Sequence, residues 1–166
     1  MTWPQTIFWV EAPAAGRLAV VSRPRVLASF TELKASGIDV LVSLLEDEEA
    51  ADVGLGDEAA HCRVAGIEPV SVPIADHGVP ASLTAIDVPV AAIVRYLEAG
   101  RGVGAHCYAG LGRSPLLVAA TLIRLGHTVG DAIEQVSRAR GCPVPEMDSQ
   151  HAWLEAFAAR RQGVPR

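Results

Sequence analysis

The chain has 166 residues, half of them apolar, and a formal net charge of −5 at pH 7. This length and apolar fraction suit one folded unit, so we predict a single domain over residues 1–166. The negative charge, without a concentrated stripe of Lys and Arg, argues against nucleic acid or an anionic membrane as the main partner. Every apolar stretch is interrupted by Gly, Pro or a charge before it reaches membrane-spanning length, and the N-terminus lacks a leader pattern.

The apolar periodicity and the turn residues predict alternating strands and helices. In chain order we expect strands at Thr6–Val10 and Leu18–Ser22, a helix at Val26–Ser36, a strand at Asp39–Leu44, a helix at Asp57–Ala65, a strand at Glu68–Val72, a helix at Leu83–Ala99, a strand at Val103–His106, and helices at Pro115–Leu125, Val129–Arg140 and Ser149–Arg160. This alternation predicts an α/β fold with a central mixed sheet flanked by helices.

Two kinds of residue mark where helices start or stop. Pro89 interrupts the helix at Leu83–Ala99, which predicts an irregular first turn or a kink there. Glycines follow five of the predicted helices, where a left-handed capping residue is often needed: Gly37, Gly66, Gly100, Gly126 and Gly141.

The cysteines indicate the compartment. Cys62, Cys107 and Cys142 show neither the spacing of a zinc site nor that of a secreted disulfide framework. We therefore expect a reducing cytoplasm, no bound metal and no other cofactor. The sequence carries no signal for an oligomeric state.

The most informative segment runs from His106 to Ser114 and reads HCYAGLGRS. It joins a short apolar strand to a Leu/Ala/Val-rich helix, and Gly110 and Gly112 let consecutive backbone amides converge on one oxyanion. The positive end of the following helix points to the same place. Ser114 before Pro115 is typical of a helix start, with Ser114 as the capping residue.

These residue types suit chemistry on a phosphate group. Cys107 is the candidate nucleophile, since the amides stabilise its thiolate, and Arg113 is the candidate for gripping two phosphate oxygens. Ser114 is expected to donate a hydrogen bond to the Cys107 sulfur, and His106 to orient the loop. The expected phosphate-binding residues are Tyr108, Ala109, Gly110, Leu111, Gly112 and Arg113. The alternative from cysteine and arginine spacing alone is a free cysteine near an unrelated arginine.

On these residues the chain resembles the cysteine-dependent protein tyrosine phosphatase superfamily, whose signature is His-Cys, five residues, then Arg-Ser or Arg-Thr. Within it the loop is most similar to those of the CDC14-like and cyclin-dependent-kinase-associated dual-specificity phosphatases. The resemblance implies the phosphatase fold and hydrolysis through a phosphocysteine intermediate. It also makes Cys62 and Cys142 candidates for trapping oxidised Cys107 as a disulfide.

Breaking a phosphate ester also requires a proton for the leaving oxygen, and Asp76 is the candidate acid. It lies in a loop rich in Pro and Gly directly after a predicted strand. The resemblance places an acid-bearing loop here, although the family's Trp-Pro-Asp form is absent. The alternative is a turn-forming aspartate. The rival Asp87 lies inside a helical stretch, and His77 is expected to be a solvated loop residue.

Hydrolysis of a phosphocysteine requires a positioned water, and the resemblance makes Gln150 the candidate residue. The alternative is an ordinary glutamine near the start of an exposed helix, with Asp148 or Ser149 as its cap. The sequence thus predicts a phosphatase acting on phosphotyrosine, with phosphoserine and phosphothreonine as further candidates, in a phosphorylated protein or peptide. A phosphopeptide-binding module without turnover and a sulfurtransferase-type thiol enzyme are the alternatives. The uncharged loop positions disfavour a highly anionic lipid headgroup.

Overall fold

A five-stranded mixed sheet forms the centre of the molecule. The computed structural model describes residues 5–162, with side chains described through residue 160. The strands are β1 (Ile7–Val10), β2 (Arg17–Val21), β3 (Val40–Ser43), β4 (Glu68–Ser71) and β5 (Gly102–His106), in the sheet order β1-β2-β5-β3-β4. β1 is antiparallel to β2, and the other pairs are parallel. The predicted mixed sheet is confirmed.

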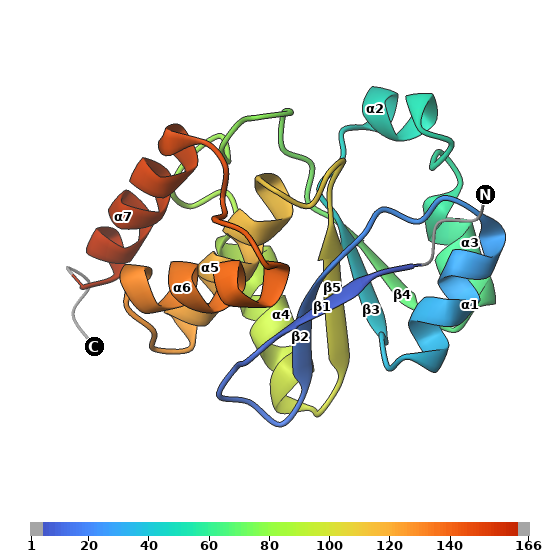
Figure 1. Ribbon diagram of the computed structural model, residues 1–166, viewed down its shortest axis with the longest axis horizontal. Coiled ribbons are helices and arrows are strands. Elements are labelled where there is room, and N and C mark those ends of the chain that lie inside the picture. The colour runs from blue at the N-terminus through green and yellow to red at the C-terminus, as the bar shows by residue number, and fades with distance from the viewer. Residues whose placement is uncertain (1–4, 163–166) are drawn as a thin grey trace.

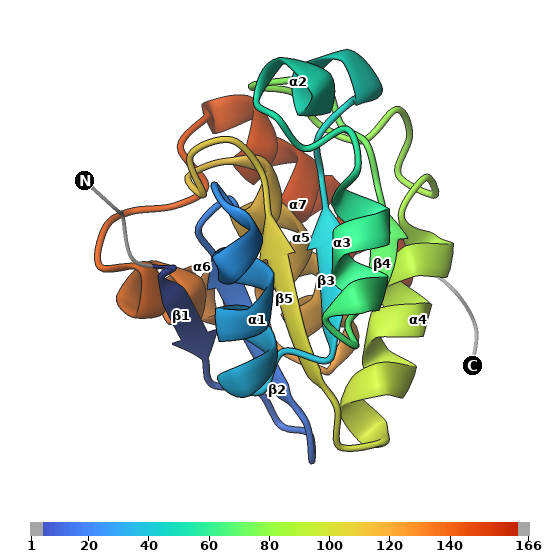
Figure 2. The same cartoon turned by 90° about the vertical axis from the view of Figure 1, so that its right-hand side faces the viewer.

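Helices cover both faces of this sheet (Figures 1 and 2). The helices are α1 (Leu27–Ala35), α2 (Asp47–Asp52), α3 (Glu58–Val64), α4 (Asp87–Glu98), α5 (Arg113–Arg124), α6 (Val129–Arg140) and α7 (Asp148–Gln162). In Figure 2, α1 and α3 lie in front of the sheet and α5 to α7 lie behind it. No helix among residues 5–162 is long and apolar enough to cross a membrane.

Two apolar cores follow from the alternation of side chains along the strands. Val40 and Val42 join the larger core with α4 to α7, whereas Leu41 between them joins the smaller core with α1 and α3. In β5, Val103 and Ala105 face the larger core. Gly104 faces the other side, where an added Cβ would lie 2.9 Å from a methyl carbon of Val21.

The central helix α5 is buried along nearly its whole length. Its residues from Arg113 to Ile123 are all buried, because α4, α6 and α7 surround it against the sheet. Its Leu, Ala and Val content marks it as part of the core. Its N-terminus, directly after the loop that follows β5, is thereby held in one position.

Element boundaries agree with the sequence within a few residues except in two places. The short α2 was not predicted, because six residues with no buried side chain provide no periodicity. The element predicted at Leu83–Ala99 begins as turns, and α4 starts at Asp87 with Pro89 in its first turn. The five glycines predicted to follow helices all have positive φ, from 78° at Gly66 to 107° at Gly126.

The cap of α5 also differs from the prediction. Ser114 was predicted to cap this helix, but α5 begins at Arg113 after Gly112, and no side chain caps it. Pro115 still falls in the first turn, where a missing N–H costs no helical hydrogen bond. The prediction was wrong because the loop continues into helix geometry one residue before the serine, which leaves Ser114 free to face Cys107.

A pair of glycine substitutions tests the packing around β5. An alanine Cβ at Gly102 would lie 1.8 Å from the carbonyl oxygen of Gly37, and both atoms belong to fixed backbone. We expect Gly102→Ala to lower the free energy of unfolding by about 2–4 kcal/mol, as overpacking does.

The matched control is Gly130→Ala in α6, where no heavy atom lies within 4 Å of the added carbon. This variant should be unchanged or stabilised by about 0.5 kcal/mol, since alanine has the better helix propensity. Urea unfolding measures both. Equal stability of the two variants would contradict the close approach at Gly102.

Candidate active site

The site lies at the carboxyl end of β5, the central strand of the sheet. Because side chains alternate along β5, Cys107 follows Val103 and Ala105 toward the larger core, and only 3% of its surface is exposed. Its sulfur lies 3.2 Å from the hydroxyl oxygen of Ser114, in the first turn of α5. The structure therefore has the contact expected between these two side chains.

The loop after Cys107 is held by an arginine from another helix. Arg140, the last residue of α6, donates from Nε to the carbonyl oxygen of Gly110 at 3.0 Å and from Nη2 to that of Ala109 at 3.3 Å. The N–H of a trans peptide points opposite to its carbonyl. Each contact with Arg140 therefore turns an amide, that of Gly110 or Leu111, away from Arg140. Gly110 has the positive φ of 72° that this path requires.

Arg113 is almost completely buried, and oxygen atoms surround both of its terminal nitrogens. Nη1 donates to Glu49 at 2.7 Å and to the carbonyl oxygen of Ile74 at 3.0 Å. Nη2 donates to Glu49 at 2.8 Å and to Asp76 at 3.0 Å. Each terminal nitrogen carries two hydrogens, so both are fully used, and the Nε–H is left for another acceptor.

The charges around Arg113 decide its protonation. Burial by itself lowers the pKa of Arg113, but its hydrogen bonds to Glu49 and the negative charges of Cys107, Glu49 and Asp76 raise it above its ordinary value. The same hydrogen bonds hold the pKa of the Glu49 carboxyl below its ordinary value of 4.5. This arginine therefore stays charged at all physiological pH values.

Asp76 lies in the loop after β4, and its side chain contacts Arg113. Its carboxylate accepts from Arg113 and from the backbone N–H of His77, each at 3.0 Å, while 60% of its side chain stays exposed. His77 has a positive φ of 60°, which is uncommon for a residue with a side chain. The rival Asp87 forms two hydrogen bonds with Arg160 at the start of α4 instead.

Gln150 is buried in the first turn of α7 and connects two loops. Its Nε2 donates to the carbonyl oxygen of Gly78 at 3.1 Å, and its Oε1 accepts from the backbone N–H of Met147 at 3.2 Å. A Cβ on Gly112 would lie 2.8 Å from Nε2, so only a glycine at this position lets the Gln150 amide approach the loop between Cys107 and Arg113. The alternative of an ordinary glutamine near the start of an exposed helix does not fit this fully buried side chain.

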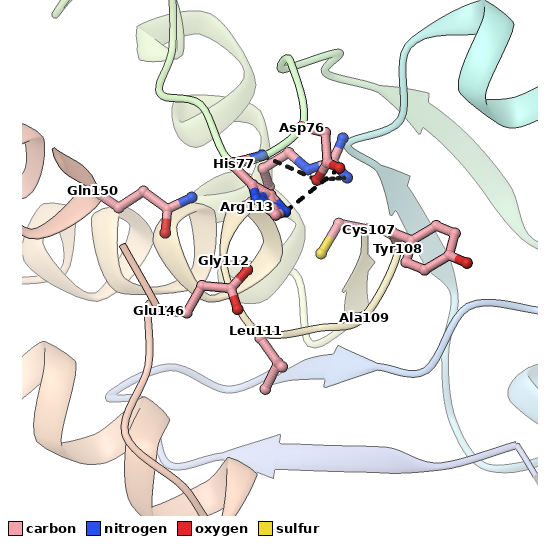
Figure 3. Close-up of a pocket in the computed structure, with 10 residues that line it drawn as sticks. All are labelled: Asp76, His77, Cys107, Tyr108, Ala109, Leu111, Gly112, Arg113, Glu146 and Gln150. Atoms are coloured by element: carbon pink, nitrogen blue, oxygen red, sulfur yellow. Dashed lines mark hydrogen bonds and ion pairs between the residues drawn. The ribbon is translucent and has the colours of Figure 1, made fainter. Parts of the chain in front are cut away.

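One pocket of about 160 Å³ brings these residues together. Figure 3 shows the Cys107 sulfur, the Arg113 guanidinium and the Asp76 carboxylate around it, with Gln150 and Tyr108 on opposite sides. The lining residues are Asp76, His77, Cys107, Tyr108, Ala109, Leu111, Gly112, Arg113, Glu146 and Gln150. Of the predicted site residues, Gly110 and Ser114 do not line the pocket.

Three pocket neighbours were not predicted as functional. His77 and Glu146 line the pocket, and Glu49 binds Arg113 from α2. The sequence signal for His77 is its place directly after Asp76. Glu49 lies in an acidic run, Glu46 to Glu49, where nothing local distinguishes it from a solvated carboxylate. Tyr108 forms the rim, half exposed, with the Arg23 guanidinium 4.3 Å from its ring centroid.

The other cysteines occupy different surroundings. Cys62 packs in the smaller core on the face of the sheet opposite Cys107, and burial raises its pKa to about 12. Cys142 is partly exposed and packs against the core that contains Cys107. Trapping of oxidised Cys107 by Cys62 is therefore excluded without unfolding. Among residues 5–160, no three His, Cys, Asp or Glu side chains are grouped to hold a metal ion.

Comparison with known proteins agrees with this geometry. A family model described as "Polymorphic toxin system, DSP-PTPase phosphatase" matches residues 19–127, about two thirds of the chain. The chain belongs to this phosphatase family. The match contains most of β2, all of β3 to β5, the loop after β5 and α5. It confirms the predicted membership of the cysteine-dependent dual-specificity phosphatases.

Individual relatives are more distant. The protein tyrosine phosphatase PRL-1 of Leishmania major is 37% identical over 63 residues, which are 37% of this chain and 35% of that protein. The chain thus matches about a third of that relative. The structure called Tk-PTP in the active form is 26% identical, with a TM-score of 0.79, and covers 96% of this chain and 99% of its own.

Kinase associated phosphatase, solved with its catalytic-site cysteine substituted by serine, has a TM-score of 0.90 over 99% of this chain and 100% of its own. At 22% identity this likeness shows the fold alone. It confirms the predicted phosphatase fold.

Replacing Glu49 with Gln tests the clamp on Arg113. A carboxyl whose pKa is lowered by folding contributes stability above its unfolded value of about 4.5, and this contribution disappears as the pH falls through the lower folded value. We expect Glu49→Gln to be less stable than the native chain at pH 7.

As the pH falls below 4.5 and through the lower folded pKa of Glu49, the two proteins should converge, because a protonated glutamate resembles glutamine. Thermal unfolding between pH 3 and 7 measures this difference. A gap that stays constant over this range would show that the ionised carboxylate of Glu49 does not contribute.

Proposed function

We propose that this protein hydrolyses phosphomonoesters on proteins through a phosphocysteine intermediate, in one catalytic domain. The observation that carries the proposal is the pocket in which Cys107, Arg113 and Asp76 meet at the end of β5. The proposed substrate is phosphotyrosine, with phosphoserine and phosphothreonine as further substrates. The three cysteines form no disulfide, and the cytoplasm is the compartment that we propose.

In the first step the Cys107 thiolate attacks phosphorus, an S–P bond forms and the P–O bond to the leaving group breaks. Loop amides and Arg113 stabilise the charge on the transferring oxygens, and Asp76 gives the leaving oxygen its proton. In the second step Asp76, now a carboxylate, takes a proton from water as the water oxygen attacks phosphorus; a new P–O bond forms, the S–P bond breaks and phosphate is released. Ser114, 3.2 Å from the sulfur, stabilises the departing thiolate, and Gln150, which lines the pocket, positions the water.

Asp76 has to move during this sequence. A phosphate oxygen can take the Nη2–H of Arg113 only when the single bond to Asp76 is given up, while the two bonds to Glu49 remain. Asp76 is 60% exposed and Glu49 only 19%, so Asp76 is the partner that can leave. Phosphate binding therefore frees the proposed acid at the moment when it is required.

Replacing Cys107 tests its proposed role as the nucleophile. The native chain should release phosphate from a phosphotyrosine peptide under reducing, metal-free conditions, and Cys107→Ser should lower the rate by at least about a thousandfold, as loss of a covalent nucleophile does. The control is Cys142→Ser, which removes a partly exposed thiol and should keep native activity.

Retained turnover by Cys107→Ser would exclude the cysteine mechanism. Tight binding of the phosphopeptide by the native chain without any release would indicate a binding module. Persulfide formation on Cys107 with a sulfur donor, without phosphate release, would indicate a sulfurtransferase.

Replacing Asp76 tests its proposed role as the acid. Asp76→Asn should lower kcat by about 10²- to 10⁴-fold for phenyl phosphate, whose leaving group requires a proton, and by much less for an activated aryl phosphate such as difluoromethylumbelliferyl phosphate. Inhibition by vanadate should be no weaker, because the variant also removes the competing carboxylate from Arg113. Asp87→Asn is the control, since its carboxylate binds Arg160. Equal losses on both substrates would remove Asp76 from proton transfer.

A further inference from the structure

A buried histidine and glutamate lie directly behind the catalytic loop. His106, the last residue of β5, has no exposed surface, and its Nε2 lies 2.5 Å from Oε1 of Glu58 in α3. The alternation that points Cys107 to the larger core points His106 to the opposite face of the sheet, where α3 packs (Figure 2). Glu58 comes from 48 residues earlier in the chain, so only the fold brings the pair together.

Both ring nitrogens of His106 face oxygen acceptors. Nδ1 lies 3.3 Å from the carbonyl oxygen of Cys107, which cannot donate, and Nε2 meets the Glu58 carboxylate. A neutral imidazole has one N–H, whereas an imidazolium donates from both nitrogens. The arrangement with a donor at each nitrogen and an ionised partner is the imidazolium–carboxylate pair, and charge assistance accounts for its short contact.

From this geometry we infer that Glu58 is a positioning residue that keeps His106 doubly protonated and so stabilises the thiolate of Cys107. The inference rests on the proposed role of Cys107 as a thiolate nucleophile. It assigns a function to a side chain that does not touch the pocket and lies on the other face of the sheet.

The pair acts on Cys107 in two ways. The Nδ1–H of His106 holds the carbonyl of Cys107, and because the peptide is trans, the N–H of Tyr108 points the opposite way. The positive imidazolium also lies on the residue next to the sulfur, where an opposite charge favours the ionised thiol. Without the Glu58 carboxylate, the Nε2–H of His106 would lose its hydrogen-bond acceptor and the buried positive charge would lose its partner.

Several other charged groups surround the His106–Glu58 pair and the Cys107 thiol. Arg113, Asp76, His77 and Glu146 line the pocket with Cys107, and Glu49 acts through Arg113. On the α3 side, Glu58 borders a surface cavity of about 400 Å³ together with Asp47 and Arg63. All of these remain when Glu58 alone is changed, so a change in the behaviour of Cys107 reports on the pair.

The test is the pH dependence of alkylation of Cys107 by iodoacetamide, followed by the mass of the peptide that contains it. For Glu58→Gln, the midpoint of this profile should rise by about one pH unit, in the range expected for loss of one nearby opposite charge. Below the midpoint, kcat/KM should fall by about tenfold, and above it the native value should return. Glu58→Asp, which keeps the carboxylate, should lie closer to the native chain.

The control is Glu68→Gln, which removes the same charge from β4, where Glu68 binds Tyr96 and Arg101 instead of His106. It should keep the native profile. A native midpoint in Glu58→Gln would overturn the inference, since a merely structural role would lower stability without moving the profile.

A second measurement uses the native chain, so its outcome does not depend on whether a variant folds. The ¹⁵N chemical shifts of the His106 ring in the native chain should show two protonated nitrogens, and one unprotonated nitrogen would overturn the inference. Alkylation requires no substrate, so the outcome is separate from that of the phosphatase proposal. If the native chain released no phosphate but Glu58→Gln still shifted the alkylation profile of Cys107, the result would contradict the proposed phosphatase activity and support the proposed role of Glu58.

Discussion

The site depends on peptide carbonyls of the catalytic loop that are held away from the pocket. Arg140 binds those of Ala109 and Gly110 from α6, and His106 lies against that of Cys107 from β5. Because each amide points opposite to its carbonyl, these contacts turn N–H groups away from Arg140 and His106, as the proposed anion-binding nest requires. The nest is therefore a product of tertiary contacts with both a strand and a helix, in addition to the loop's own glycines.

The arginine of the pocket shows a division of work between two carboxylates. Glu49 forms two hydrogen bonds with Arg113 and is mostly buried, so it fixes the plane of the guanidinium and keeps it charged. Asp76 forms one bond from an exposed loop. In the proposed mechanism an arriving phosphate competes with Asp76, the more exposed partner with the single bond, so the arginine keeps its orientation while it changes its ligand.

The sequence predicts the parts of this site that are local in the chain. Apolar runs located all five strands, and the spacing from Cys107 to Arg113 identified two residues that the fold brings to one pocket. Glu49 and Glu58 could not be found in this way, because each lies in a short helix many residues from the loop and has the same local pattern as a solvated acid. Ser114 was identified for its contact with sulfur, while its predicted capping role was wrong because the loop enters α5 one residue earlier.

The charges of the site leave a problem that the proposed acid solves. Arg113 and His106 are opposed by Glu49, Glu58, Asp76 and the Cys107 thiolate, so the cluster is already negative before a phosphate arrives. Protonation of Asp76 weakens its bond to Arg113, frees the Nη2–H for a phosphate oxygen and removes one negative charge. The same proton is the one that the leaving oxygen requires. In the proposed mechanism, admission of the substrate and supply of the acid are therefore one event at Asp76.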